Sequence, residues 1–200
     1  MKRIAFLVLL MLFPLLAEAK GKIIEAPSAE HPSIQLAIDG AKNGDEVRVE
    51  SGKYLFDKPI MIKEKENFSL SAKGKVSLSN KNGAALIVEN SNISIEGIIF
   101  FRNEIALECS DSIISVKGSK FQKNRIGIQG VGSVIISDKN VFDTNFLAAI
   151  LLSGQDNNLK IVPSTSFRNN YADIYPYSVN SSSETLRPQG NKIFFGRLKD

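Results

Sequence analysis

Polar and aromatic side chains recur at matched positions in the second half of the chain, each one, three or five residues after the Asn of a repeated Phe-x-x-Asn motif. The aromatic members offer flat apolar faces, and the charged and amide members offer hydrogen-bond partners. This combination suits the binding of a carbohydrate. The candidate carbohydrate-binding residues are Glu104, Arg125, Gln129, Phe146, Tyr171, Asp173 and Tyr175.

The same residues also fit an ordinary solvent-exposed sheet. In that interpretation Glu104 and Arg125 form a cross-strand ion pair, which contributes about 0.2–1 kcal/mol to stability. The residue types alone leave both interpretations open.

The sequence contains no set of residues that predicts a catalytic centre. A calcium site needs several oxygen ligands together, and glycoside hydrolysis needs a pair of carboxylates. The carboxylates Asp138, Asp143 and Asp156 fall in different bends, and the chain has one His and one Cys. We therefore expect no catalytic residue, no metal site and no cofactor.

The element that positions these residues is the repeated motif itself, which begins at Phe100, Phe121, Phe142 and Phe167 with spacings of 21, 21 and 25 residues. Apolar residues alternate on both sides of each copy, which is the period of a strand with one buried face. The alternating pairs are Ile93/Ile95, Ile114/Val116, Val134/Ile136 and Leu159/Ile161 before the motif, and Ile105/Leu107, Ile126/Ile128, Leu147/Ala149 and Ala172/Ile174 after it.

Short strands that recur every 21 to 25 residues without intervening helices predict a coil whose turns pair in parallel with one another. Such stacking places the four Phe rings above one another inside the coil. It also stacks the Asn amides, which can bond each other along the axis. Because Asn tolerates left-handed backbone conformations, we expect these Asn residues to shape the bends.

The repeat, together with the segment from Ser33 to Tyr54, resembles the right-handed parallel β-helix proteins of the pectate-lyase-like group over residues 33–174. The resemblance implies an all-β, right-handed parallel β-helix solenoid with a short N-terminal capping helix. It also implies binding of an extended polysaccharide along an outer sheet face. A small polysaccharide lyase or glycoside hydrolase is the alternative function, and a structural or assembly module is a further one.

The alternation predicts three outward columns on the strand that follows each Asn. The middle column consists of small residues and would form a shallow floor between two walls of larger side chains. The columns are Glu104, Arg125, Phe146 and Tyr171; then Ala106, Gly127, Ala148 and Asp173; then Glu108, Gln129, Ile150 and Tyr175.

The ends of the solenoid need covers, since an open end exposes core side chains and strand edges. Residues 33–41 predict the capping helix, with Ser33 as N-cap and Ile34, Ala37, Ile38 and Ala41 on one face. We expect coils over about 47–175, and a C-terminal cap or tail over 176–200, all within one domain of residues 20–200.

Residues 1–19 have the pattern of a secretory signal peptide, with Lys2 and Arg3 before an apolar run and Ala17-Glu18-Ala19 at its end. The run from Ile4 to Leu16 is shorter than the ~20 residues that a membrane span needs. We therefore expect an exported protein, periplasmic or extracellular, with no membrane span after cleavage.

The formal charge of +4 is spread along the chain, and no basic stripe predicts nucleic-acid binding. The expected partner is a polysaccharide or a cell-envelope component.

Overall fold

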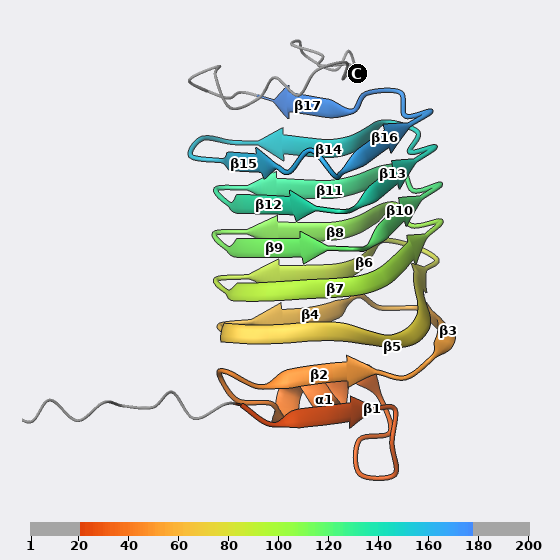
Figure 1. Cartoon of the computed structure of the whole chain (residues 1–200), viewed down its shortest axis with the longest axis vertical. Helices are drawn as coiled ribbons and strands as arrows, with labels where there is room; N and C mark the ends of the chain where they lie inside the picture. Colours follow the sequence, from red (N-terminus) through yellow and green to blue (C-terminus); the bar gives the residue numbers. More distant parts are fainter. Residues whose placement is uncertain (1–20, 178–200) are drawn as a thin grey trace, which may run out of the picture.

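The computed structural model describes residues 21–177, so the predicted signal peptide and most of the predicted C-terminal cap or tail lie outside the described residues. The described chain forms a solenoid of about seven turns (Figure 1). Its elements are β1 (Ile23–Ala26), α1 (Ile34–Gly40), β2 (Glu46–Val49), β3 (Gly52–Phe56), β4 (Ile60–Lys63), β5 (Glu66–Asn80), β6 (Ala84–Glu89), β7 (Asn92–Phe101), β8 (Ile105–Ser110), β9 (Ile113–Lys117), β10 (Lys120–Gln122), β11 (Ile126–Val131), β12 (Val134–Asp138), β13 (Val141–Asp143), β14 (Ala148–Ser153), β15 (Asn158–Ile161), β16 (Ser166–Arg168) and β17 (Ile174–Tyr177).

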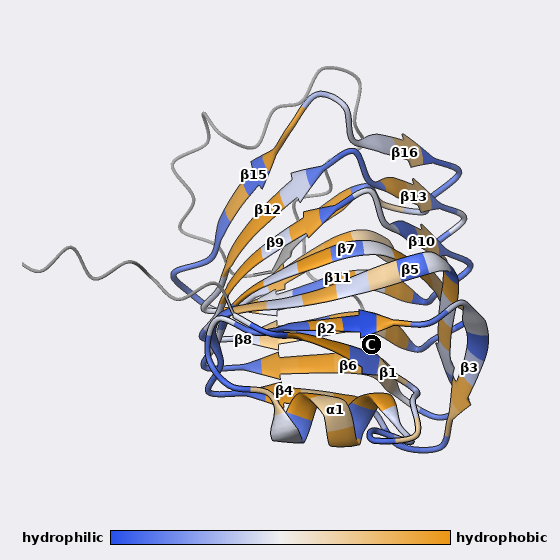
Figure 2. Ribbon diagram, turned by 60° about the horizontal axis from the view of Figure 1, so that its bottom comes forward, coloured by the Kyte–Doolittle hydropathy of each residue, from blue (hydrophilic) through white to orange (hydrophobic). Residues whose placement is uncertain are grey.

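The strands form two sheets, and within each sheet all neighbouring strands pair in parallel. One sheet has eleven strands and runs from β1 through β2, β5 and β7 to β10, β13 and β16, with β3, β9, β12 and β15 joined to it. The other has six strands in the order β4, β6, β8, β11, β14 and β17. In Figures 1 and 2 the chain runs one way along the first sheet, returns along the second and climbs, which makes the coil right-handed. The predicted parallel β-helix is therefore confirmed.

The helix α1 closes the N-terminal end of the six-stranded sheet, as the sequence predicted. The Ser33 hydroxyl accepts a hydrogen bond from the Leu36 backbone N–H (3.1 Å), which caps the helix. Ile34, Ala37 and Ile38 are buried against the core. The solenoid begins earlier than predicted, because β1 precedes the helix and pairs with β2.

The four repeated Phe residues form a continuous stack. The ring centroids of Phe100, Phe121, Phe142 and Phe167 lie 4.9, 4.6 and 5.1 Å apart in succession, with interplanar angles of 8–9°. The first three rings are fully buried. The predicted aromatic column is therefore confirmed, and it fixes the register of successive turns.

The motif's Asn residues form a buried ladder beside the Phe stack. The side-chain amide of each of Asn124, Asn145 and Asn170 donates to the backbone carbonyl of the Phe one turn below, at 3.1–3.2 Å. The residue in the left-handed conformation is the one before each Asn, with φ of 52–58° at Arg102, Lys123, Thr144 and Asn169. The expected stacking of the Asn amides is confirmed, since each amide also bonds the next along the axis.

A second ladder, which the sequence did not suggest, forms at the bends on the other side of the coil. The Ser91 and Ser112 backbone N–H groups donate to the hydroxyls of Ser112 and Ser133, at 3.1 and 3.2 Å. The Ser133 N–H donates in turn to Asn157 Oδ1 (3.1 Å). Small hydroxyl side chains thus satisfy the backbone where the chain turns.

Two predicted strand phases are wrong. In β12 the buried residues are Ile135 and Ser137, not Val134 and Ile136, because Ile135 pairs in register with Ile114. In β8, two successive residues, Ala106 and Leu107, both lie in the main core. Two consecutive buried residues break the strict alternation of buried and outward side chains that was predicted for every strand after the motif.

Candidate functional site

The residues that directly follow the ladder Asn residues form a column on the outside of one corner of the solenoid. The column lies between the β7–β10–β13–β16 ladder and the β8–β11–β14–β17 ladder, and its members are Glu104, Arg125, Phe146 and Tyr171. The Arg125 N–H donates to the Asn103 carbonyl (2.9 Å), and Phe146 and Tyr171 make the same bond to Asn124 and Asn145. The Asn ladder therefore sets the spacing of this column.

The side chains of this column are exposed, as predicted. Phe146 and Tyr171 have 64% and 62% of their surface exposed, the two largest exposed fractions among the large apolar residues of the described chain. Arg125 Nη1 and Glu104 Oε1 form an ion pair at 2.7 Å. The column thus presents two aromatic faces beside a paired carboxylate and guanidinium.

A surface hollow lies against the first three members of the column. Four of its lining residues are cationic, whereas Glu104 is the one carboxylate among them. The hollow is lined by Lys81, Asn82, Arg102, Asn103, Glu104, Lys123, Arg125 and Phe146. Its excess of positive charge favours an anionic group, since several cations around one concave surface add their potentials.

Arg102 and Lys123 reach the hollow because of their backbone conformation. Both precede a ladder Asn and have positive φ, 58° and 56° respectively, which turns their side chains outward at the corner. The Arg102 guanidinium lies 5.0 Å from the centroid of the Phe101 ring, a cation–π contact that holds it in place. The sequence did not indicate either residue, since an Arg and a Lys in a bend give no signal of this geometry.

Gln129 and Tyr175 belong to a different column, on the face of the six-stranded sheet that points away from the main core. Gln129 pairs in register with Glu108 and Leu151, and Leu151 pairs with Tyr175. The prediction placed Ile150 in this column, but Ile150 is buried in the core and pairs with Ile174. The observed partner of Gln129 lies one residue beyond the predicted one, because the register joins Gln129 to Leu151 and not to Ile150. Tyr175 is 5% exposed, in a small apolar cluster with Leu151, Ala148 and Ile126.

The predicted shallow floor of small residues is wrong. Ala106 and Ala148 are fully buried, and a Cβ on Gly127 would lie 3.0 Å from the Phe142 ring, so this position faces the aromatic stack. Asp173 is likewise buried, and its Oδ1 accepts a hydrogen bond from Asn170 Nδ2 (3.1 Å). Of the seven candidates, the corner brings together Glu104, Arg125, Phe146 and Tyr171.

The chemistry open to the corner is binding through cations, hydrogen bonds and ring faces. Over residues 21–177, no group of three or more His, Cys, Asp or Glu side chains is placed to hold a metal ion. Cys109 lies in the core, where burial raises the pKa of its thiol to about 12, so it is a packing residue rather than a nucleophile.

No family model and no curated protein matches the sequence. Among solved structures, the chain is similar to a pectin methylesterase mutant in complex with a hexasaccharide, with a TM-score of 0.41 and 11% identity over 84% of this chain and 68% of that chain. The chain's own parallel ladders define it as a parallel β-helix protein. Within the described part, no helix is long and apolar enough to cross a membrane.

Proposed function

We propose that this chain is an exported, non-catalytic β-helix domain that binds a polysaccharide at the corner formed by Glu104, Arg125, Phe146 and Tyr171. The observation that carries the proposal is the juxtaposition of exposed rings and a cationic hollow on one rigid corner. Aromatic faces stack on sugar rings, and cationic side chains hold carboxylate or sulfate groups on the sugars.

The charge of the hollow makes an acidic polysaccharide the preferred class. Arg125 is partly neutralised by Glu104 at 2.7 Å. Lys81 pairs with Asp57 (3.3 Å), and both side chains are largely exposed, so solvent weakens that pair. Arg102 and Lys123 form no ion pair within residues 21–177, and they are the cations we assign to the ligand's anionic groups.

The proposal that this chain is non-catalytic rests on the same residues. The lining holds one carboxylate, Glu104, and it is already engaged by Arg125. A retaining or inverting hydrolase needs two carboxyl groups across the scissile bond, and the hollow supplies no second one.

Calorimetry with an acidic and a neutral polysaccharide of equal length tests the proposal. We expect the purified chain to bind the acidic polymer, with affinity that falls as salt is added, and to bind the neutral polymer weakly. The double variant Arg102→Gln, Lys123→Gln should lose about tenfold or more in affinity, as for the loss of two charged hydrogen bonds.

The matched control removes two exposed cations elsewhere, Lys75→Gln and Lys160→Gln, and should bind like the parent. Equal loss in both double variants would assign the binding to net charge rather than to the corner. Release of unsaturated or reducing-end products during incubation would replace the binding proposal with a lyase or a hydrolase.

A further inference from the structure

Over residues 21–177, the N-terminal end of the solenoid is covered on one sheet, whereas the other sheet ends in an edge strand. The helix α1 covers the six-stranded sheet, whereas β1 is the terminal strand of the eleven-stranded sheet and, among described strands, pairs with β2 alone. Figure 2 shows α1 across the end of the coil with β1 and β2 beside it. An open edge strand is a template for another strand.

The register of β1 shows which backbone groups face outward. The carbonyls of Lys22 and Ala26 accept hydrogen bonds from Glu46 and Glu50, both at 2.8 Å. Because alternate residues of a parallel strand point their backbone groups to the same side, Ile23 and Glu25 direct their N–H and C=O groups away from β2. The Ile23 side chain is 50% exposed on this strand.

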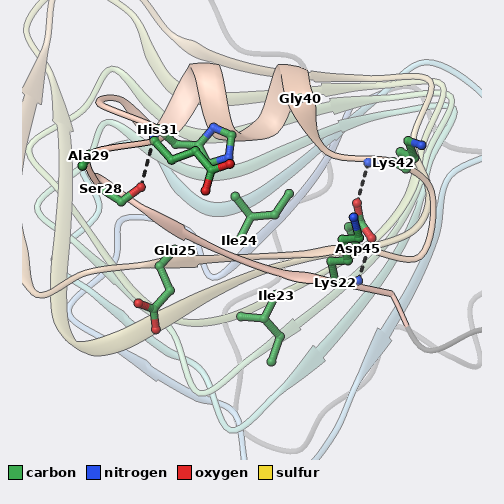
Figure 3. A pocket seen from close by; sticks show the side chains of 11 residues that line it. Lys22, Ile23, Ile24, Glu25, Ser28, Ala29, His31, Gly40, Lys42 and Asp45 are labelled. Atoms are coloured by element: carbon green, nitrogen blue, oxygen red, sulfur yellow. Dashed lines mark hydrogen bonds between the residues drawn. The ribbon is translucent and has the colours of Figure 1, made fainter.

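A hollow lies beside β1, between the strand, the loop that carries Ser28 and His31, and the end of α1 at Gly40 (Figure 3). Its two ends differ in charge. Lys22 and Lys42 lie together beside Asp45 at one end, where the Asp45 carboxylate accepts their backbone N–H groups, both at 2.7 Å. Glu30 adjoins His31 at the other end of the hollow.

We propose that this edge is a homodimer interface, in which β1 pairs antiparallel with β1 of a second copy about a two-fold axis at Ile24. The residues whose backbone groups point away from β2 then oppose one another. Ile23 exchanges both backbone hydrogen bonds with Glu25 of the second copy, and Glu25 does the same with Ile23 of the second copy. The two Ile24 side chains meet at the axis, on the face that lines the hollow. The sheets of the two copies become continuous.

The charge distribution favours a second copy over another partner. An isologous interface must complement itself, and the two-fold axis sets the Lys42 end of one hollow against the Glu30 end of the other. Within the described chain, neither Lys42 nor Glu30 takes part in an ion pair. Both charges are thus available to the second copy.

Sedimentation of the purified chain over a concentration series, with its N-terminus determined by mass spectrometry, tests the proposal. We expect a monomer–dimer equilibrium. Ile23→Pro removes an N–H that points away from β2, so the fold is kept, as circular dichroism should show, while the dimer is lost. Leu36→Ala is the control, because the Leu36 side chain is 52% exposed on the helix and does not line the hollow. This variant should dimerise like the parent.

Charge exchange tests the two-fold arrangement itself. Lys42→Glu and Glu30→Lys should each weaken the dimer about tenfold or more, because each places like charges across the interface. A mixture of the two variants should restore dimers, since the heterodimer regains both opposite-charge pairs. A chain that stays monomeric up to millimolar concentration, a dimer that persists in Ile23→Pro, or a mixture without rescue would each overturn the proposal.

Discussion

The side-chain oxygen of Asn124 accepts two hydrogen bonds from one neighbour, the backbone N–H of Asn103 at 3.0 Å and the side-chain amide of Asn103 at 2.9 Å. Asn145 and Asn170 repeat this arrangement one turn further along. The ladder therefore joins successive turns at the corner that carries the candidate site, and its integrity affects both stability and binding.

Asn124→Ala should destabilise the fold by about 2–4 kcal/mol, because it leaves the Asn103 N–H and the Phe100 carbonyl buried without their partner. Chemical denaturation measures the change. Asn158→Ala, at an exposed position of β15, should alter the free energy of unfolding by no more than about 0.5 kcal/mol. Similar values for the two variants would contradict the structural role of the ladder.

Phe121→Ala should cost about 3–5 kcal/mol, as for other truncations of a buried Phe. Phe121 lies between two rings, at 4.9 and 4.6 Å, and is fully buried. Phe146→Ala serves as the matched control, because that ring is 64% exposed. A loss of less than about 1 kcal/mol for Phe121→Ala would show that the stack does not stabilise the core.

Asp45 should make stability depend on pH at the acidic end. The hydrogen bond from the Lys42 backbone N–H, with that from Lys22, holds the pKa of the Asp45 carboxyl below its usual value of 3.8. Its contribution is therefore present above pH 3.8 and is lost as the pH falls through the lower folded-state pKa. Melting temperatures of the parent and Asp45→Asn should differ at neutral pH and converge on acidification. A constant difference would show that protonation of Asp45 does not affect folding.

The aromatic pair of the corner should be required for polysaccharide binding. Phe146→Ala combined with Tyr171→Ala should abolish binding in calorimetry, because both exposed rings are removed, and should leave the circular dichroism spectrum unchanged. Glu104→Gln should weaken binding less, since Glu104 already pairs with Arg125. Equal binding by the double variant and the parent would exclude this corner as the site.

Export should be accompanied by cleavage after Ala19, which would leave Lys20 as the first residue. Mass spectrometry of protein recovered from outside the cytoplasm measures the N-terminus directly. An N-terminus at Met1, or protein retained in the membrane fraction, would contradict the predicted signal peptide.

The sequence by itself determined the fold and its two inner stacks. A recurrence of 21 residues brings like residues to the same place on successive turns, so identical side chains at Phe100, Phe121 and Phe142 had to stack, and the Asn residues with them. The helical cap at Ser33 was also predictable, because capping and helix amphipathicity are local properties.

Only the tertiary structure decided which side chains meet at the corner. Ala106 and Leu107 both lie in the main core, which excludes the predicted floor, because burial in the core overrides strict alternation. The left-handed backbone at Arg102 and Lys123 is imposed by the ladder that follows them and is not signalled by either residue type. The cationic hollow is therefore formed by residues about one turn apart, whose side chains point to the same side of the corner because of contacts between successive turns.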